Sequence, residues 1–473
     1  MHARSKDLAQ FFSPRSIAII GVTRKPGAFG GGTFLEKLLE CGFQGNLYPI
    51  NPKAHEIQGV KAYSSLLALP ETPDLAIVSV AAHTVPEALE DCARAGVRHI
   101  HILASGFSET RTKEGLELEE RIVSVCERNG LLVIGPNCMG PYCPSSSLTA
   151  WGAIPGMTGP VGVISQSGAM TQRLTEYLCS LGVGVEKAVS MGNAALLDST
   201  DYLEFMGEDQ KIRLIAMYLE SVKDGRRLLG LAREIGKEKP IIILKGGESE
   251  VGAKTVISHT GSLAGEQRLW EAFFRQTGAV HVRSMNEWVD SILALSQLPA
   301  AKGNGVFLVG GGGGNSVASS DTCIREGLDV PLLSGATMEK MREMVPVAGS
   351  IAGNPLDTWR TYDDPEYLKR ILELGYKDPR VSMVVVDRLI PRAAFHGSGR
   401  NHATPEIIEF VKARQQGKPT IFTVDYDGGD PDLTSRGMTL RAELCRAGLP
   451  TYPSLSRAAR ALAHLYRYYA RFN

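Results

Sequence analysis

His259 is the residue of this chain whose surroundings most favour chemistry. It stands in the run from Ser258 to Gly265, where its neighbours are serine, threonine, glycine, leucine and alanine, after an apolar segment and a glycine-rich turn. An imidazole can act as a nucleophile and carry a transferred group, and glycine gives the segment freedom to move. The alternative is a solvated histidine in an ordinary loop, which residue type alone does not exclude.

A second candidate site lies upstream, where the apolar run 161–164 leads into Ser165, Gln166, Ser167 and Gly168. This order is typical of a strand, a tight turn and the start of a helix. The first N–H groups of a helix have no partner within it and bind anions. An ordinary serine N-cap would give the same pattern, and a cap whose N–H groups stay open would serve both purposes. Together with His259, this helix start predicts a histidine that carries a phosphoryl group.

Composition excludes several classes of protein. The 473 residues include 51 basic and 51 acidic side chains, so no global field favours nucleic acid or a membrane surface. No apolar run approaches the roughly 20 residues that span a bilayer, and the first residues lack the apolar core of a signal peptide. We therefore expect a cytoplasmic protein.

The cysteines carry a separate prediction. All eight are scattered along the chain without a C-x-x-C pair. This spacing argues against a disulfide framework and against a zinc site. We expect reduced thiols and no protein-bound metal.

Short apolar strands alternate with helices along most of the chain, which predicts an α/β fold with parallel sheets and crossover helices. The pattern breaks at a loop rich in proline and serine, 141–155, and at a linker, 299–305. Strands are expected near residues 16–21, 45–50, 75–80, 99–104, 131–134, 161–164, 214–219, 240–244, 306–309 and 381–387. We predict three domains, residues 1–147, 148–299 and 300–473, which agrees with the number expected from the length.

The first expected strand ends in a turn that resembles a nucleotide-binding βα turn. The glycine spacing after Gly21 does not fit the dinucleotide fingerprint G-x-G-x-x-G, because position 23 is threonine. The next strand ends in Asn51, Pro52 and Lys53 where an acidic residue would hold a ribose diol. A lysine suits a phosphorylated ribose or a pyrophosphate better. Coenzyme A therefore fits this turn better than NAD does, and an NADP-like ligand lies between the two.

These residues also carry a family resemblance. The chain resembles the α subunit of the NDP-forming acyl-CoA synthetases, the superfamily of ADP-forming acetyl-CoA synthetase and succinyl-CoA synthetase. Six ordered runs span nearly its whole length: 16–21, 48–53, 105–107, 135–138, 165–168 and 258–265. The resemblance implies an N-terminal Rossmann-like CoA-binding domain followed by two flavodoxin-like, succinyl-CoA-synthetase-like domains.

The resemblance also implies a reaction. Phosphate attacks an acyl-CoA to give an acyl phosphate and free CoA, His259 takes the phosphoryl group, the carboxylic acid leaves, and ADP receives the phosphate. In the family a glutamate at a strand end orients the histidine, and Glu220 matches its position. By residue type alone, Glu220 would be an ordinary solvated strand-end carboxylate. The run 165–168 matches the phosphate-binding helix start.

The residues implied to bind CoA fall in three groups. They are Gly21, Thr23, Arg24 and Gly30 around the phosphates, Asn51 and Lys53 at the nucleotide end, and Ser105, Gly106, Asn137 and Cys138 toward the thioester. The family uses no cysteine intermediate, so Cys138 is not expected to be a nucleophile. One departure from the family is the segment 81–83, Ala-Ala-His, where proline is common, and it puts the local CoA contact in doubt.

The third domain resembles one that ADP-forming members carry and the α subunit of succinyl-CoA synthetase lacks. Its five glycines, 310–314, are explained either by an anion site or by a tight strand-to-helix turn without a ligand, and the turn is favoured. Nothing in the chain resembles the nucleotide-grasping domain of the superfamily. The resemblance therefore implies a separate ATP-grasp β subunit that holds ADP or ATP with Mg²⁺, in an α/β heteromer.

Two other classes of function remain as alternatives. One is a CoA-binding regulator or scaffold with the same fold, against which the pair of His259 and Glu220 argues. The other is an NAD(P)-dependent oxidoreductase, against which the absent fingerprint argues. The carboxylic acid itself is not identified by the sequence.

Overall fold

The computed structural model describes residues 3–23, 30–148, 156–252, 266–310, 312–388, 405–414, 417–426 and 429–472. The chain divides into two compact units. The first comprises Met1–Cys179 with Gly184–Arg283, and the second Ser180–Val183 with Ser284–Asn473. Within the described ranges the first unit holds two large sheets and a small hairpin, and the second holds one sheet.

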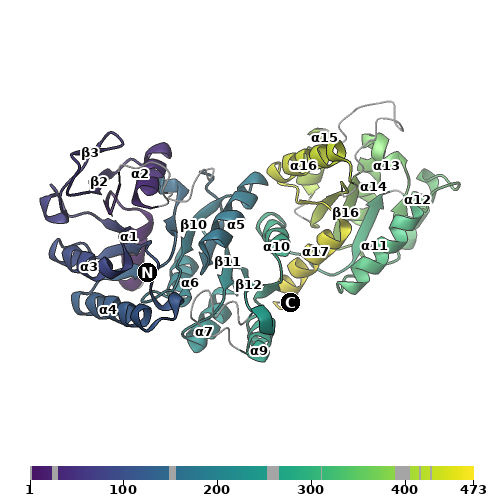
Figure 1. The fold of residues 1–473 in the computed structure, drawn as a ribbon. Coiled ribbons are helices and arrows are strands. Elements are labelled where there is room, and N and C mark those ends of the chain that lie inside the picture. Colours follow the sequence, from purple (N-terminus) through teal and green to yellow (C-terminus); the bar gives the residue numbers. More distant parts are fainter. Residues whose placement is uncertain are drawn as a thin grey trace. The chain divides into compact units, whose positions relative to one another are not determined.

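The N-terminal sheet of the first unit is wholly parallel and has the order β2-β1-β5-β6-β7 (Figure 1). Its strands are β1 (Ser16–Ile20), β2 (Asn46–Ile50), β5 (Leu75–Val78), β6 (His99–Ile102) and β7 (Leu132–Ile134). The order reverses between β1 and β5, the place where open α/β sheets bind ligands at their carboxyl ends. The central strand β5 is apolar and buried along its whole length, because helices cover both faces of such a sheet.

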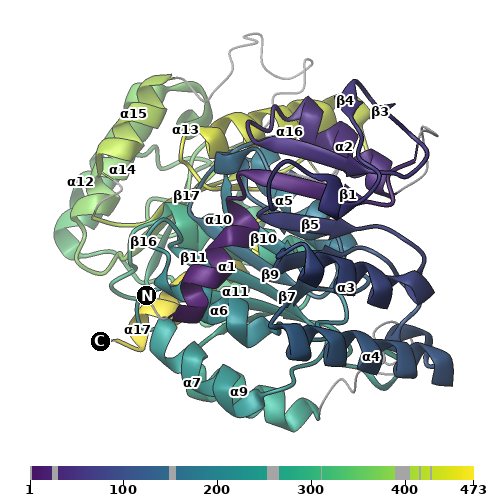
Figure 2. The same cartoon turned by 90° about the vertical axis from the view of Figure 1, so that its left-hand side faces the viewer.

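The helices of this part are α1 (Ala3–Phe12), α2 (Gly31–Glu40), α3 (Val85–Arg94) and α4 (Lys113–Asn129). Figure 2 shows α3 and α4 lying side by side. Short elements complete it: the hairpin β3 (Glu56–Ile57) and β4 (Val60–Lys61), and the 3-10 turns η1 (Leu66–Ala68), η2 (Ala82–Thr84), η3 (Ser108–Thr110) and η4 (Pro144–Ser146).

The second sheet of the first unit has the order β13-β12-β11-β9-β10-β8. Its strands are β8 (Gly140–Tyr142), β9 (Val161–Ser165), β10 (Val185–Ser190), β11 (Leu214–Leu219), β12 (Ile241–Lys245) and β13 (Val280–Val282), and its described helices are α5 (Gly168–Ser180), α6 (Ser199–Glu208), α7 (Gly225–Ile235) and α9 (Gln267–Thr277). The five strands from β9 onward are parallel in a flavodoxin-like order. Its reversal point lies between β9 and β11.

The second unit repeats this order in a third parallel sheet, β15-β14-β16-β17-β18. The strands are β14 (Val306–Gly310), β15 (Leu356–Asp357), β16 (Met383–Arg388), β17 (Thr420–Val424) and β18 (Thr451–Tyr452). The helices are α10 (Met285–Gln297), α11 (Gly313–Arg325), α12 (Gly335–Met344), α13 (Arg360–Asp363), α14 (Pro365–Lys377), α15 (Pro405–Arg414), α16 (Pro431–Arg446) and α17 (Leu455–Ala470). The predicted α/β class with parallel sheets is confirmed.

Helix α10 belongs to the compact unit of the third sheet, although it directly follows the second sheet in the chain. Its Asp290 accepts hydrogen bonds from Arg457 of α17 at 2.5 and 2.7 Å, and its Ser291 hydroxyl lies 2.8 Å from Nδ1 of His464. These polar contacts fix α10 to α17. The domain limits at residues 147 and 299 stay predictions.

One local expectation was wrong. The segment expected as a loop from residue 141 begins with β8, which pairs with β10 in antiparallel register. β8 is the edge strand of its sheet, and an edge position tolerates Pro141 because one side of the strand needs no N–H donor. All eight cysteines are free thiols in the structure.

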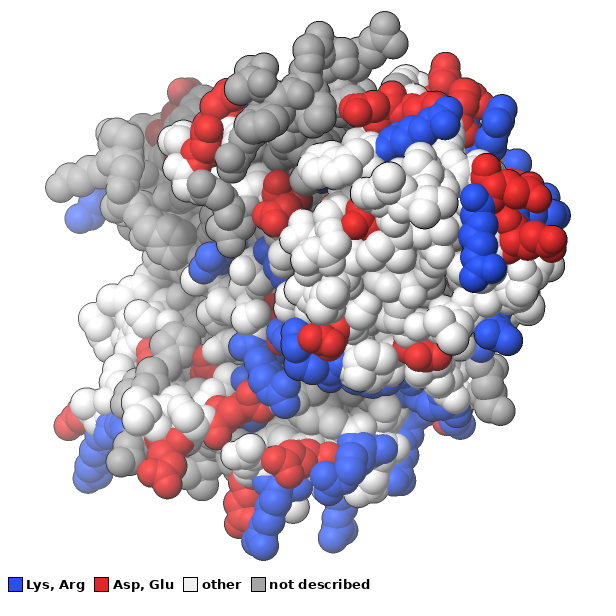
Figure 3. Space-filling model, turned by 90° about the vertical axis from the view of Figure 1, so that its right-hand side faces the viewer, with Lys and Arg blue, Asp and Glu red and all other residues white. Residues whose placement is uncertain are grey.

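On the face in Figure 3, basic and acidic side chains both border a broad area without charged residues, and neither charge dominates there. Among the described helices, none is both long and apolar enough to cross a membrane.

His101 of β6 is fully buried behind the carboxyl end of the first sheet. Its Nε2 lies 3.1 Å from the carbonyl oxygen of Cys138, and a Cβ on Gly140 would stand 2.5 Å from its ring. Burial lowers the pKa of His101 from 6.5 to about 4, and the bond to Cys138 opposes that shift only partly. The imidazole is therefore neutral in the folded protein at neutral pH.

This burial predicts acid sensitivity. Between pH 6.5 and 4 the unfolded chain binds a proton at His101 that the folded chain does not, so stability falls as the pH falls through this window. The contribution is on the order of 3 kcal/mol. Urea unfolding at pH 7, 5.5 and 4.5 should show a shallower loss of stability for His101→Gln than for the native chain. The same substitution at the exposed His83 is the control, and parallel losses in all three proteins would contradict the assignment.

Candidate active site

A cavity of about 550 Å³ lies in the first unit, where the carboxyl ends of strands from both its sheets meet. It is lined by Ser79, Val80, Ala81, Ala82, Leu103, Ala104, Ser105, Asn137, Cys138, Met139, Gln166, Ser167, Gly168, Ala169 and Gly192. None of these described lining residues carries a formal charge. A charged ligand in this cavity must therefore be stabilised by peptide groups and dipoles.

The start of α5 presents such peptide groups. Ser165 ties the turn before the helix, since its hydroxyl accepts the N–H of Ser167 at 3.0 Å and donates to the carbonyl of Ser167 at 2.9 Å. In the described structure the N–H groups of Gly168 and Ala169 have no hydrogen-bond partner, and both residues line the cavity. The helix start is therefore open toward the cavity.

Gln166 joins the two central strands of the second sheet at their carboxyl ends. Its Oε1 accepts the N–H of Glu220 at 2.5 Å and that of Ser221 at 3.0 Å, and its Nε2 donates to the Ser221 hydroxyl at 3.2 Å. Its own N–H donates to the carbonyl of Tyr218. The side chain of Gln166 is thus committed to the turn that carries Glu220.

Glu220 itself is buried, with 3% of its surface exposed. The Tyr218 hydroxyl donates to its Oε1 at 3.0 Å. The structure therefore excludes the ordinary alternative of a solvated strand-end carboxylate. A buried carboxylate in a built turn is the arrangement that an orienting acceptor needs.

Asn137, Cys138 and Met139 form the wall between the two sheets. Asn137 adopts a left-handed backbone with φ 58°, and its N–H donates to the carbonyl of Ala104 at 2.9 Å. The thiol of Cys138 points to the carbonyl of Ile102, and burial raises its pKa, so no reactive thiolate forms. The Met139 side chain lies against Gly168, where a Cβ would come within 2.4 Å of its Cγ.

Asn193 connects this wall to the first sheet. Its Oδ1 accepts from Asn137 at 3.3 Å, while its Nδ2 donates to Glu109 at 2.6 Å and to Glu119 at 2.9 Å. Glu109 also accepts the N–H of Gly106 at 2.6 Å. The predicted Gly106 thus lies beside the cavity with its N–H already occupied by a carboxylate.

The residues predicted for the phosphates of CoA follow β1, and those predicted for its nucleotide end follow β2. Gly21 has φ 89°, and a Cβ there would meet the carbonyl oxygen of Ser79 at 2.3 Å, so only glycine fits the turn. Gly30 is the N-cap of α2, and Thr23 and Lys53 are exposed. Asn51 holds the turn together, since its Nδ2 donates to the carbonyl of Val22 at 2.7 Å and its Oδ1 accepts the N–H of Lys53 at 2.8 Å.

The structure brings most of the predicted residues to one edge of two sheets. The cavity is lined by six of them, Ser105, Asn137, Cys138, Gln166, Ser167 and Gly168. Gly21, Thr23, Gly30, Asn51 and Lys53 follow the neighbouring strands and do not line it. His259 and Arg24 lie outside the described residues.

Sequence reasoning missed four residues around this edge, namely Tyr218, Lys245, Asn193 and Met139. Lys245 left a signal, because it is a charged residue directly after the buried run Ile241–Leu244. Asn193 and Met139 gave none, since their partners come from distant parts of the chain.

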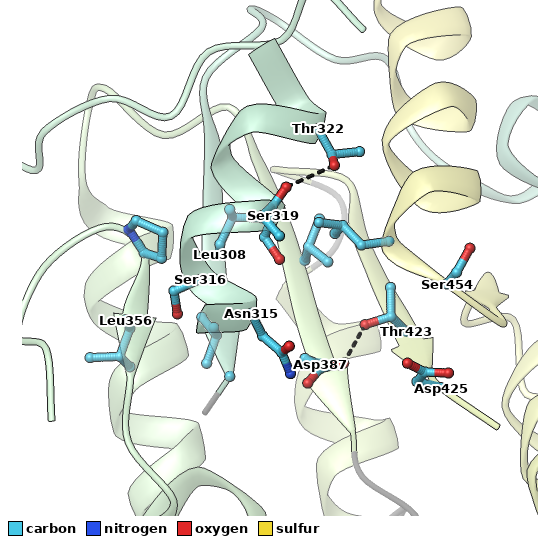
Figure 4. Close-up of a pocket in the computed structure, with 16 residues that line it drawn as sticks. Leu308, Asn315, Ser316, Ser319, Thr322, Leu356, Asp387, Thr423, Asp425 and Ser454 are labelled. Carbon is cyan, nitrogen blue, oxygen red and sulfur yellow. Dashed lines mark hydrogen bonds between the residues drawn. The ribbon is translucent and has the colours of Figure 1, made fainter. Parts of the chain in front are cut away.

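The second unit has a cavity of about 220 Å³ at its own reversal point, between β14 and β16 (Figure 4). Asp387 stands at its base and accepts from the Thr423 hydroxyl at 2.7 Å and from the Tyr362 hydroxyl at 2.8 Å. The N–H of Gly312, just before α11, donates to Asp357 at 2.5 Å. Gly312 is the N-cap residue of α11, so the carboxylate of Asp357 stabilises the turn just before the helix. The choice between an anion site and a tight turn without a ligand stays a prediction.

Three family models match the chain in order. They are a CoA binding domain at residues 15–144, a succinyl-CoA ligase like flavodoxin domain at 158–295 and a Ligase-CoA domain at 306–433. The models follow the three large sheets in order, except that β8 of the second sheet falls within the first model and β18 of the third sheet lies beyond the last one. The sequence resemblance is thereby confirmed over nearly the whole chain.

Curated relatives and solved structures agree with these models. The chain is 34% identical to the acetate–CoA ligase (ADP-forming) I subunit alpha of Pyrococcus furiosus, over 98% of this chain and 97% of that one. It is 33% identical to the longer acetate–CoA ligase (ADP-forming) I of Archaeoglobus fulgidus, over 98% of this chain and 64% of that one. A dinucleotide forming acetyl-coenzyme A synthetase 1 of Ca. Korarchaeum cryptofilum, solved with phosphate and ADP, superimposes with a TM-score of 0.86 at 31% identity, covering 98% and 97% of the two chains. The chain belongs to the family of ADP-forming acyl-CoA ligases and corresponds to their α subunit.

Proposed function

We propose that this chain binds an acyl-CoA and passes a phosphoryl group from an acyl phosphate to His259, as the α subunit of an ADP-forming acyl-CoA ligase. The observation that carries the proposal is the open start of α5 in an uncharged cavity, one strand away from the buried Glu220. The overall reaction interconverts acyl-CoA, ADP and phosphate with carboxylic acid, CoA and ATP.

The first step needs a place for a phosphate beside a thioester. An oxygen of phosphate attacks the thioester carbonyl, the C–S bond breaks, and CoA leaves as the thiol. The N–H groups of Gly168 and Ala169 lie at the N-terminus of α5, where the helix dipole stabilises a phosphate dianion most strongly. Ser105, Asn137 and Cys138 line the same cavity from the turns after β6 and β7 of the first sheet, and they fit the thioester end of CoA.

The second step needs a neutral, oriented imidazole. A ring nitrogen of His259 attacks the phosphorus, the bond between phosphorus and the acyl oxygen breaks, and the carboxylate leaves. Glu220 is the acceptor for the other ring N–H, because Gln166 and Tyr218 hold it in place. The same carboxylate then stabilises the positive charge that the ring acquires.

The phosphohistidine passes its group to ADP on a separate subunit. We place ADP or ATP with Mg²⁺ on an ATP-grasp β subunit of an α/β heteromer in the cytoplasm. The α-subunit name of the Pyrococcus furiosus relative and the longer single-chain relative of Archaeoglobus fulgidus support this division. Which carboxylic acid the enzyme uses is a question for substrate profiling.

Gly21 provides a test of the CoA site. Gly21→Ala forces a left-handed backbone on alanine, at a cost of about 1–3 kcal/mol, and drives its Cβ into the Ser79 carbonyl. We expect the affinity for CoA to fall at least about tenfold in a calorimetric titration. Gly59→Ala is the matched control, because Gly59 has φ 79° and no atom within 4 Å of an added Cβ. Equal affinities in the two variants would remove Gly21 from the CoA site.

Labelling tests the phosphohistidine directly. The purified chain, with and without a co-expressed β subunit, is incubated with acetyl-CoA and labelled phosphate, and the protein is analysed for acid-labile, base-stable label. We expect label in the native chain and none in His259→Ala. Label that persists in His259→Ala would contradict the role of this residue. No label with the partner and several acyl-CoAs would favour the CoA-binding regulator.

A further inference from the structure

Lys245 is a buried lysine at the carboxyl end of an inner strand, in the same sheet whose neighbouring strand leads into Glu220. It is the last residue of β12, pairs with Leu219 of β11, and has 5% of its surface exposed. Its Nζ donates to the carbonyl of Glu220 at 2.9 Å and also to the carbonyl of Gly246. The ring of Trp270 lies 5.3 Å from the ammonium and covers it.

This lysine is costly to bury. Its hydrogen bonds within the described structure go to carbonyl oxygens, and the nearby carboxylates of Glu248 and Glu220 act on it through space. Burial lowers the pKa of Lys245 to about 8, and those carboxylates offset only part of the shift. The other residues of this strand, Ile241 to Leu244, are apolar, and an apolar side chain at position 245 would cost less free energy to bury than a charged one. The charge therefore needs a reason other than the stability of the sheet.

The bonds of Lys245 and Gln166 supply that reason. Glu220 lies one residue beyond the end of β11, so its peptide groups are outside the strand ladder and need other partners. The Oε1 of Gln166 accepts the N–H of Glu220 at 2.5 Å, and the Nζ of Lys245 donates to the carbonyl oxygen of Glu220 at 2.9 Å. The backbone of Glu220 is thus held from both neighbouring strands, β9 and β12.

We infer that Lys245 is a positioning residue for phosphoryl transfer, which acts with Gln166 by fixing the peptide of Glu220 and so the direction of its carboxylate. The inference rests on the proposed function, because it takes Glu220 as the acceptor for His259. A carboxylate that orients an imidazole must be placed to a fraction of an ångström, and a displacement of about 1 Å costs on the order of 100-fold in rate. Lys245 touches neither substrate nor histidine in this role.

The chain contains a matched control for burial. Lys239 precedes the same strand at its opposite end and is also buried. Its Nζ donates to the carbonyls of Met206, Gly207 and Asp209 at 3.3, 2.6 and 2.7 Å, and burial lowers its pKa as well. Lys239 is therefore buried and hydrogen-bonded to carbonyl oxygens as Lys245 is, but none of these three bonds of Lys239 goes to Glu220.

The test compares Lys245→Met with Lys239→Met in the complex with the β subunit. Steady-state ATP formation from acetyl-CoA, ADP and phosphate gives kcat and KM, and thermal unfolding gives Tm. We expect Lys245→Met to lower kcat on the order of 100-fold with little change in KM for acetyl-CoA or phosphate. Lys239→Met should lower Tm to a similar extent and leave kcat close to that of the native protein.

A double variant separates positioning from damage. If Lys245 acts through Glu220, then Lys245→Met combined with Glu220→Gln should be no slower than Glu220→Gln alone. Lys245→Gln keeps an N–H donor for the Glu220 carbonyl and should recover part of kcat, and it replaces Lys245→Met if that variant does not fold. A native kcat in the Lys245 variants, or additive losses in the double variant, would overturn the inference while phosphohistidine labelling of the native chain still stands. Absence of that label in the native complex would overturn the proposed function and the inference with it.

Discussion

The hydrogen bonds that the side-chain oxygen of Gln166 accepts from the N–H groups of Glu220 and Ser221 are the constraint on which the site depends. They close the gap between β9 and β11 at the point where the strand order reverses. Gln166 also lies two residues before α5, so the turn that leads to the open helix start is joined to the turn that carries Glu220. The anion site and the partner of His259 that we propose are thereby held near each other by one turn.

The walls of the cavity come from two sheets, and polar side chains lock these sheets together. Asn193 donates to Glu109 and Glu119 and accepts from Asn137, so the loop after β10 is tied to both the turn after β6 and the turn after β7. Such a network is rigid when every member has a partner. The carboxylates of Glu109 and Glu119 form hydrogen bonds inside the walls and do not line the cavity. The lining that the structure describes is therefore uncharged, and peptide dipoles face the interior.

The sequence predicts the parts of this arrangement that are local. Runs such as Ile17 to Ile19 are apolar throughout, so strands between covering helices follow from composition. The turn at Ser165 and the strand end at Glu220 could also be read from residue order. The strand β8 could not, because an edge strand of three residues with a proline gives no periodic signal. The roles of Asn193 and Lys245 could not either, since each depends on carbonyls or carboxylates that only the folded topology brings near.

The third sheet shows that topology alone does not make the site. It has the same flavodoxin-like order and a cavity at the same reversal point, followed by a helix after a glycine-rich turn. There the N–H of Gly312 is already bonded to Asp357, and Asp387 is held by two hydroxyls. Burial raises the pKa of Asp387, and a second carboxylate at Asp425 lines the same cavity. The cavity of the third sheet is thus lined by two carboxylates, whereas the described lining of the cavity at α5 contains no charged residue. Two copies of one fold therefore differ in charge at the same reversal point because different side chains line it.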